Sequence, residues 1–327
     1  MRLVMMGTGS FAEPTLQALL GSPHQVVGLV TQPDRTTGKE RASTRQARRG
    51  MKEMAQERGI PLFQPESINT QEGVHALDAW KPDLLVVAAY GQILSKDVLA
   101  VAPKGGVNVH ASLLPKYRGA APIAWAIYNG ETETGVTIIR MSTALDAGDL
   151  LAQEKIPIGP EDTAGELETR LAPLGARLAL TVIDQIAAGK SSGTPQNKAE
   201  ATKAPKLTKE HGLIDWTRHA RGICNQIRAM QPWPTAFTFL HRPQEAPLRL
   251  IVFQARVVPD ATLVLLGPRA GLVRLVPGHP HFYVETGAGD QVEILELQPA
   301  GKRRMASGEF LRGHAVEDGW QLGGETP

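Results

Sequence analysis

The first half of the chain alternates continuous apolar runs with amphipathic stretches, and this alternation restricts the fold more than any other feature. Amphipathic stretches at 11–20 and 44–58 separate the earlier runs. Apolar runs that lack polar alternation are typical of strands buried on both faces of a parallel sheet. The pattern predicts a doubly wound α/β domain, with strands at residues 3–6, 25–31, 83–89, 106–110, 136–141 and 150–158.

The pattern changes after residue 188. Residues 189–206 are rich in Gly, Ser, Thr, Pro, Gln and Lys, a composition typical of a linker. A helix is predicted at 217–230, and Gly and Pro separate the short strand-like runs that follow it, which indicates a small β-barrel or sandwich. These runs lie at 236–240, 248–257, 262–266, 271–276, 281–284 and 291–297. The predicted division is a domain at 1–188, a linker at 189–206, a second domain at 207–312 and a tail at 313–327.

Two helix starts carry the S/T-x-x-E pattern of a capping box, in which a hydroxyl and a carboxylate satisfy free backbone N–H groups. They are Ser10-Phe-Ala-Glu13 and Thr163-Ala-Gly-Glu166. Apolar residues then repeat every three or four positions from 167 to 186, which predicts a long amphipathic helix. Pro173 and Gly175 are expected to kink or divide this helix.

Composition is that of a soluble protein. The hydrophobic share is 42%, the charged share is 21%, and the longest apolar run covers only residues 84–90. Gly7, Gly9 and Glu13 interrupt any signal-peptide core. The one cysteine, Cys224, allows no internal disulfide and no cysteine-built zinc site, and its apolar neighbours indicate a buried thiol. We therefore expect a soluble, cytoplasmic, metal-independent protein that binds no membrane. We also expect a monomer.

Histidines give no further reason to expect a metal. Five of them lie in the C-terminal third of the chain without a spacing typical of metal ligands: His211, His219, His241, His279 and His281.

Positive charge is unevenly distributed, although the net charge is only +2. Between residues 35 and 50 a single acid, Glu40, accompanies six basic residues: Arg35, Lys39, Arg41, Arg45, Arg48 and Arg49. Such a run is commonly the solvated face of a helix. It also suits an arm that binds phosphates. The run alone does not decide between these two readings.

A glycine loop follows the first predicted strand. Gly7-Thr-Gly9-Ser-Phe-Ala12 fits the dinucleotide-binding pattern G-x-G-x-x-G/A. That pattern also needs an acid at the end of the second strand, whereas Asp34 here lies beyond a proline, in a turn. A tight strand-to-helix turn explains both glycines without any ligand. The helix start could also face an anionic group of a substrate.

The most informative stretch is the strand and loop from 106 to 119. Asn108 and His110 are two residues apart on a predicted strand, so they share one face. They also lie at its carboxyl end, where open α/β sheets place their sites. An amide donor and an imidazole together can hold a carbonyl oxygen as it becomes an oxyanion. The loop after them contains Pro115 and Gly119, which favour an irregular path along a pocket.

A carboxylate partner follows downstream. Asp146 lies in the glycine-containing loop Leu145-Asp-Ala-Gly-Asp149, between two predicted strands. It can take a proton from an attacking amine and can pair with a protonated His110. The simpler alternative is an aspartate that caps its own turn.

These segments together resemble the folate-dependent formyltransferases. The resemblance rests first on Asn108-Val-His110, Ser112-Leu-Leu-Pro115, Arg118-Gly-Ala-Ala-Pro122 and Leu145-Asp-Ala-Gly-Asp149. It continues beyond the predicted linker and spans nearly the whole chain. Further matching segments lie on both sides of the linker: Thr31-Gln-Pro-Asp-Arg35, Ala89-Tyr-Gly-Gln-Ile-Leu94, Ile214-Asp-Trp216, Pro232-Trp-Pro234 and Leu297-Gln-Pro-Ala-Gly-Lys302.

The resemblance implies a Rossmann-like catalytic domain and a C-terminal OB-like barrel that binds tRNA. It also implies a formyl donor, 10-formyltetrahydrofolate, and an acceptor, the α-amine of methionyl initiator tRNA. Asn108, His110 and Asp146 match the family's catalytic set. Two segments match the folate-contacting parts: Ser112, Leu113, Leu114 and Pro115, and then Tyr90, Gly91, Gln92, Ile93 and Leu94. The basic run matches a loop that reaches the acceptor end of tRNA, and Lys206, Lys302, Arg303 and Arg304 are further candidates.

The sequence departs from the family pattern at two places. Gly9 replaces a proline, so the likeness to a dinucleotide loop is accidental under this interpretation. Lys39 replaces an arginine of the basic loop, and lysine cannot make the same bidentate phosphate contact. Other readings stay open: transfer to a nucleotide-linked amino sugar, a folate hydrolase module, a non-catalytic RNA-binding protein and a nicotinamide-dependent enzyme.

Overall fold

The structure is a computed structural model that describes residues 1–34, 42–258, 269–314 and 316–326, without the side chains of 42–49. The chain forms two compact units. The first comprises residues 1–123, 133–158 and 166–206, and the second comprises 124–132, 159–165 and 207–327. Among the described residues, no helix has the length and hydropathy needed to cross a membrane.

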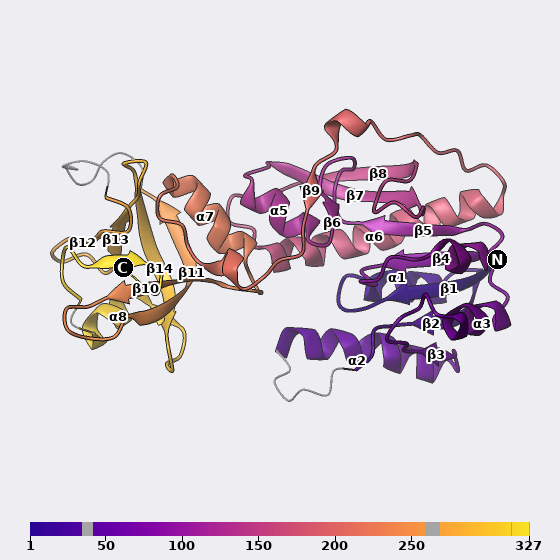
Figure 1. The fold of residues 1–327 in the computed structure, drawn as a ribbon, viewed down its shortest axis with the longest axis horizontal. Helices are drawn as coiled ribbons and strands as arrows, with labels where there is room; N and C mark the ends of the chain where they lie inside the picture. Colours follow the sequence, from indigo (N-terminus) through magenta and orange to yellow (C-terminus); the bar gives the residue numbers. More distant parts are fainter. Residues whose placement is uncertain (35–41, 259–268, 315, 327) are drawn as a thin grey trace. The chain divides into compact units, whose positions relative to one another are not determined.

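The first unit is built on one sheet with the strand order β3-β2-β1-β4-β5-β7-β8 (Figure 1). Neighbours from β3 to β5 pair in parallel, whereas β5–β7 and β7–β8 are antiparallel. The strands are β1 (Arg2–Gly7), β2 (Gln25–Val30), β3 (Leu62–Phe63), β4 (Leu84–Ala88), β5 (Gly106–His110), β7 (Glu133–Arg140) and β8 (Leu150–Pro157). The predicted α/β class is confirmed, and the sheet is mixed because its last two strands form an antiparallel pair.

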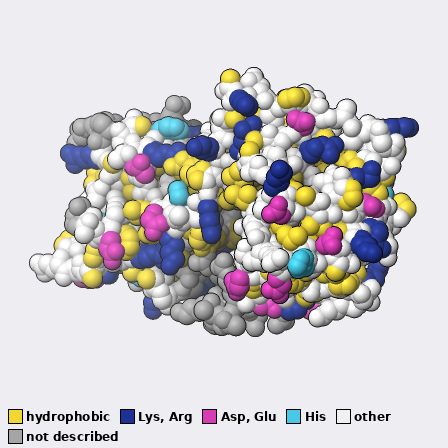
Figure 2. Space-filling view, turned by 45° about the vertical axis from the view of Figure 1, so that its right-hand side comes forward, with side chains coloured by type: hydrophobic (Ala, Val, Ile, Leu, Met, Phe, Trp, Pro, Cys, Tyr) yellow, Lys and Arg dark blue, Asp and Glu magenta, His cyan; other side chains and the backbone are white. Residues whose placement is uncertain are grey.

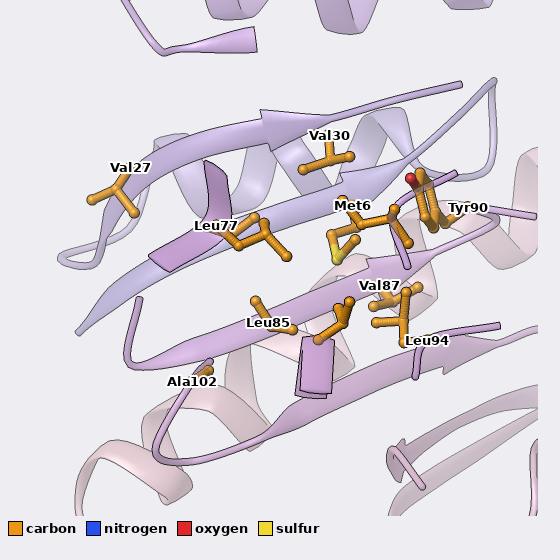
Figure 3. Packing of buried hydrophobic residues seen from close by; sticks show 12 residues of the cluster. Met6, Val27, Val30, Leu77, Leu85, Val87, Tyr90, Leu94 and Ala102 are labelled. Carbon is orange, nitrogen blue, oxygen red and sulfur yellow. The ribbon is translucent and has the colours of Figure 1, made fainter. Parts of the chain in front are cut away.

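Helices connect these strands, and side chains from both sheet and helices form the core. The helices are α1 (Glu13–Leu20), α2 (Ala42–Glu57), α3 (Gln71–Ala79), α4 (Lys96–Ala100) and α6 (Ala164–Ala187). A further helix, α5 (Pro122–Tyr128), precedes β7, and its residues from 124 onward belong to the second unit. One buried cluster takes Met6, Val30 and Val87 from three neighbouring strands together with Leu77 from α3 (Figure 3). Such burial contributes roughly 1.5–3 kcal/mol for each large aliphatic side chain.

The structure contradicts the predicted cap of the first helix and the predicted division of the long one. Helix α1 begins at Glu13 with Ala12 as its N-cap residue and no side-chain cap. The hydroxyl of Ser10 instead donates to the Glu168 carboxylate, far away in the sequence. Helix α6 is a single helix of 24 residues with Pro173 inside it, so proline does not divide it. Burial of its apolar face, including Leu171 and Leu174, outweighs the hydrogen bond that proline removes.

The second unit is a nearly closed antiparallel barrel with the order β12-β13-β14-β11-β10-β16. A bridge between Leu272 and Gln321 joins the two ends of that order. The predicted barrel is confirmed, and the run predicted at 262–266 lies outside the described residues. Its elements are α7 (Ala220–Ala229), β10 (Ala236–His241), β11 (Leu248–Val257), β12 (Val273–Leu275), β13 (Phe282–Glu285), β14 (Gln291–Pro299), β15 (Met305–Ala306), α8 (Ser307–Gly313) and β16 (Gln321–Gly323).

The predicted linker and tail both take part in folded structure. Within 189–206, β9 (Lys203–Ala204) pairs with β6 (Arg118–Gly119), and Thr194 forms an antiparallel bridge with Leu150. Within 313–327, β16 pairs with β10. Polar composition predicted neither pairing, because backbone hydrogen bonds to distant segments do not depend on side-chain type.

Candidate functional site

Strand β5 carries the two polar side chains that the sequence singled out. Asn108 and His110 lie two residues apart at its carboxyl end, next to β4 and β7 in the sheet. The loop between β7 and β8 brings Asp146 to them. The structure thus brings together all three residues expected in the catalytic set, although 38 positions separate Asn108 from Asp146.

The Asp146 carboxylate is the centre of this group. Its Oδ1 accepts a hydrogen bond from Asn108 Nδ2 at 3.1 Å, and its Oδ2 accepts one from the Gly119 backbone N–H at 2.9 Å. Oδ2 also lies 3.6 Å from His110 Nδ1. A carboxylate with two donors and an imidazole around it is held in one orientation. The alternative that Asp146 merely caps its own turn does not account for these three contacts.

The His110 ring is held from both sides. Its Nε2 lies 2.9 Å from the Tyr117 carbonyl oxygen, which can only accept, so this nitrogen carries a hydrogen. Its Nδ1 faces the Asp146 carboxylate, which when ionised also only accepts. Both ring nitrogens therefore face oxygen atoms that accept hydrogen bonds. The two side chains are 5% and 10% exposed, so electrostatic interactions between them are screened weakly.

The backbone of the Asp146 loop is unusual at two positions. Asp146 has a φ of +48°, in the left-handed region that aspartate tolerates better than most residues. Gly148 approaches the end of β7 so closely that an added Cβ would lie 1.7 Å from the Arg140 carbonyl oxygen. Only glycine fits there. This close approach sets the path of the loop that presents Asp146.

The expected folate-contacting segment after β5 is anchored through its main chain. Ser112 is buried and donates to the Lys116 carbonyl, and Leu114 is buried as well. Thr137 of β7 accepts from the Leu114 N–H at 3.1 Å and donates to the Ser112 carbonyl at 2.6 Å. Gln153 of β8 donates to the Leu114 carbonyl at 2.9 Å. Side chains of Leu113 and Pro115 are only partly buried and remain the accessible pair.

The second expected folate segment follows β4, and its residues divide into two kinds. Tyr90 and Leu94 point into the apolar cluster of Figure 3 and are almost fully buried. Gln92 accepts from the Ile68 N–H and donates to the Glu66 carbonyl. Gly91 is exposed, and Ile93 is 57% exposed, which is unusual for a large apolar side chain. Gly91 and Ile93 are therefore the residues of this segment that a ligand can reach most easily.

Tyr90 has a further property. Burial raises the pKa of its phenol to about 12. Its hydroxyl has no hydrogen-bond partner among the residues that the structure describes.

The sequence did not single out three residues that hold the site: Thr137 and Gln153 beside the loop after β5, and Gln196 beside the Asp146 loop. Arg118 and Gly119 belong to the expected motif, but their hydrogen bonds to Gln196 and Asp146 were not predicted. Gln196 lies in the segment predicted as a linker, 50 residues after Asp146. No spacing rule connects positions so far apart, so only the folded chain reveals them.

The side chains of the basic run from Arg35 to Arg49 are not described by the structure. Arg35, Lys39 and Arg41 lie outside the described residues. Arg45, Arg48 and Arg49 fall within helix α2, and their side chains are likewise outside the described part. On the face drawn in Figure 2, the coloured Lys and Arg side chains are interspersed with Asp and Glu.

Two of the four C-terminal basic candidates are paired with acids. Arg303 pairs with Glu309, and Arg304 pairs with Glu296 while its guanidinium lies 4.3 Å from the centre of the Phe253 ring. Lys206 and Lys302 are exposed. A paired arginine must give up its carboxylate to reach a phosphate, which makes the two lysines the readier contacts.

The glycine turn after β1 has a structural explanation. Gly9 has a φ of +86°, which side chains rarely allow, and its carbonyl accepts from the N–H groups of Ala12 and Glu13. The turn that starts α1 therefore requires glycine at this position without any ligand.

One group in the described part of the barrel has the composition of a metal site. The ligand atoms of His279, His281 and Glu293 lie within 4.8 Å of one another. Glu293 is nevertheless already paired, with Arg256 Nε at 2.5 Å and with His281 Nδ1 at 2.7 Å. Burial opposes its ionisation, but these hydrogen bonds outweigh burial and lower the pKa of Glu293. The group is satisfied as an ion-pair network, and we assign no metal to it.

Comparison with known protein families covers both units. The profile of the formyl transferase family matches residues 1–183, and that of the formyl transferase C-terminal domain matches residues 206–315. A methionyl-tRNA formyltransferase of Desulfotalea psychrophila is 43% identical over 316 residues, which is 97% of this chain and 94% of that protein. One of Moorella thermoacetica is 42% identical over 323 residues, covering 99% of each chain.

Solved structures share the fold at lower identity. An N-formyltransferase from Helicobacter canadensis, in complex with folinic acid and dTDP-3-aminofucose, has a TM-score of 0.66 and 18% identity over 89% of this chain and 98% of its own. A sugar 3N-formyl transferase, solved with dTDP and 5-N-formyl-THF, has a TM-score of 0.65 and 17% identity over 93% and 99%. From the full-length matches at this identity, the chain belongs to the methionyl-tRNA formyltransferase family.

Proposed function

We propose that this chain transfers the formyl group of 10-formyltetrahydrofolate to the α-amine of methionyl initiator tRNA. The observation that carries the proposal is the Asp146 carboxylate, held by Asn108 and Gly119 and facing His110. An amide, an imidazole and a carboxylate in a site of low water content suit acyl transfer to an amine. The similarity to methionyl-tRNA formyltransferases supports the choice of donor and acceptor.

The proposed reaction begins when the neutral amine nitrogen attacks the formyl carbon. A carbon–nitrogen bond forms, and the electron pair of the carbonyl becomes an oxyanion. Asn108 donates one amide hydrogen to Asp146 and has a second for the oxyanion. His110 Nδ1 lies beyond hydrogen-bond distance of Asp146, so its hydrogen is also available to the oxyanion.

Asp146 handles the proton in this proposal. It accepts the proton that the attacking amine loses, directly or through a water molecule. When the tetrahedral intermediate collapses, the C=O bond reforms, the bond to folate N10 breaks, and N10 receives that proton. The products are tetrahydrofolate and the N-formyl aminoacyl-tRNA. All groups used here come from one copy of the chain, which suits a monomer, and a tRNA acceptor suits a cytoplasmic reaction.

The tRNA is proposed to bind through positive charge. The basic run from Arg35 to Arg49 would reach the acceptor end, and Lys206, Lys302 and Arg303 would contact phosphates further away. The net charge of the whole chain is only +2, so binding by phosphate contacts needs such a local concentration of charge.

The test is transfer of labelled formyl from 10-formyltetrahydrofolate to methionyl initiator tRNA, with elongator tRNA, a nucleotide-linked amino sugar and water as competing acceptors. Selective transfer to the initiator is expected. Formate release without a tRNA product would move the function to a hydrolase, and transfer to the sugar would move it to the sugar-modifying relatives. A donor that is not consumed at all would overturn the catalytic assignment.

Two variants test the residue roles. Removal of a single oxyanion donor typically costs about a hundred- to a thousandfold in rate. Asn108→Ala and His110→Ala should each lower kcat by at least about a hundredfold, with tRNA binding intact. His75→Ala is a matched control, because His75 is exposed on α3 and should change nothing. Near-wild-type kcat in either site variant would refute its assigned role.

A further inference from the structure

The side-chain amide of Gln196 joins the segment predicted as a linker to the loop that carries Asp146. Its Nε2 donates to the carbonyl oxygens of Asp146 at 2.9 Å and of Gly148 at 2.7 Å. Its Oε1 accepts from the Arg118 guanidinium, at 3.0 Å from Nε and 2.6 Å from Nη2. One half-buried amide therefore makes four hydrogen bonds and uses both of its ends.

The chemistry of these partners determines the orientation of the amide. Arginine can only donate, so the atom that faces Arg118 must be the amide oxygen. Backbone carbonyls can only accept, so the atom that faces Asp146 and Gly148 must be the NH₂ group. A carboxylate cannot replace this amide, because its second oxygen would lie against two carbonyl oxygens. The position thus demands glutamine in preference to glutamate of the same shape.

The same segment also holds the opposite side of the His110 ring. The Thr202 hydroxyl accepts from the Tyr117 N–H at 2.8 Å, and the Thr202 carbonyl accepts from the Arg118 N–H at 2.9 Å. Tyr117 supplies the carbonyl at His110 Nε2, and Gly119 supplies the N–H at Asp146. Gln196 and Thr202 therefore hold the two loops that contact His110.

We propose that Gln196 is a positioning residue, which holds the Asp146 loop so that the carboxylate faces His110 and Asn108. This inference rests on the proposed function, because it gives Gln196 a task in the same site. Gln196 acts through the Asp146 backbone: its amide nitrogen donates to that residue's carbonyl oxygen. Asp146 needs such support because its backbone has a φ of +48°, a conformation that carries strain outside glycine.

The experiment compares Gln196→Ala and Gln196→Glu with the control Asn197→Ala. Asn197 is exposed, and among the described residues its side chain hydrogen-bonds to Glu200 and to the Ala199 N–H. A misplacement of about 1 Å costs up to about a hundredfold in rate. We expect both Gln196 variants to lower kcat about 10- to 100-fold with KM for both substrates within about twofold, and Asn197→Ala to match the wild type. Glutamate keeps an ion pair with Arg118, so Gln196→Glu preserves folding if alanine does not.

A double variant separates positioning from general weakening. In an Asp146→Asn background, single-turnover rates should fall no further when Gln196→Ala is added, because residues that act as a unit are non-additive. Equal losses in both backgrounds, or Gln196→Glu with wild-type kcat, would overturn the inference. If Asp146→Asn itself retained kcat, the proposed function of the site would fail instead. A loss in Asp146→Asn without one in Gln196→Ala would refute only the role of Gln196.

Discussion

Replacement of Gly148 by alanine should disable the reaction without touching any reacting group. A Cβ at this position lies 1.7 Å from the Arg140 carbonyl oxygen, and real Cβ atoms essentially never approach closer than 3.0 Å. The loop must therefore retreat by about 1.3 Å. Asp146 lies two residues away on the same loop, and its hydrogen bond from the Gly119 N–H, now 2.9 Å, would lengthen beyond hydrogen-bond distance.

The expected reduction in rate follows from that displacement. A shift of about 1 Å at a reacting group costs up to about a hundredfold in rate, which corresponds to about 2.7 kcal/mol of transition-state stabilisation. Formyl transfer to methionyl initiator tRNA at saturating substrates should show this fall in kcat, with KM for tRNA unchanged. Gly313→Ala is the matched control, since an added Cβ on Gly313 meets nothing within 4 Å.

The reasoning would be refuted by a Gly148→Ala variant that keeps wild-type kcat. That result would mean that the loop adapts without moving Asp146, or that the carboxylate is not needed where the structure places it. A reduced kcat in the Gly313→Ala control would point instead to a general effect of added methyl groups. Thermal unfolding of both variants checks that each remains folded at the assay temperature.

Three other predictions concern stability, reactivity and tRNA binding. Tyr90→Phe should raise the free energy of unfolding by about 1 kcal/mol, because it removes a buried hydroxyl without a partner among the described residues. Burial raises the pKa of Tyr90 to about 12, so above about pH 10 the phenol ionises more readily in the unfolded chain, and the free energy of unfolding falls as pH rises towards 12. Tyr90→Phe should remove this fall, and an unchanged alkaline loss of stability would contradict the expectation. Cys224 is partly exposed, but burial of its thiol raises the pKa to about 12, so iodoacetamide at pH 8 should label it far more slowly in the native protein than after unfolding, as mass spectrometry will show; equal labelling rates would contradict this. Replacement of Arg41, Arg45 and Arg48 by alanine should weaken tRNA binding. The slope of log binding constant against log salt concentration should become shallower by up to about 0.9 for each phosphate that the protein no longer neutralises. An unchanged slope would mean that the basic run is only a solvated helix face.

The fold class and the reacting residues could be predicted because both depend on local patterns. Apolar runs without alternation indicated the buried strands of the first unit, and all four strands predicted up to residue 110 are found there. Asn108 and His110 share a face because strand side chains alternate with a period of two. The same local logic failed at Ser10, whose capping pattern is correct in sequence but whose hydroxyl bonds Glu168 instead. A capping box predicts only what neighbouring residues can do and cannot reveal a competing partner that folding brings near.

The pattern of residues in the sequence therefore determined the architecture, an α/β unit followed by a barrel, and the chemical nature of the site. The tertiary structure alone decided how that site is held together. Polar composition made the stretch around Gln196 look like a linker, yet its amide bridges Arg118 to the Asp146 loop. Composition reports how well a segment tolerates water, whereas directed hydrogen bonds depend on where the backbone carbonyls and N–H groups of distant loops lie. Those groups are the same in nearly every residue, so they leave no signal in the sequence until the chain has folded.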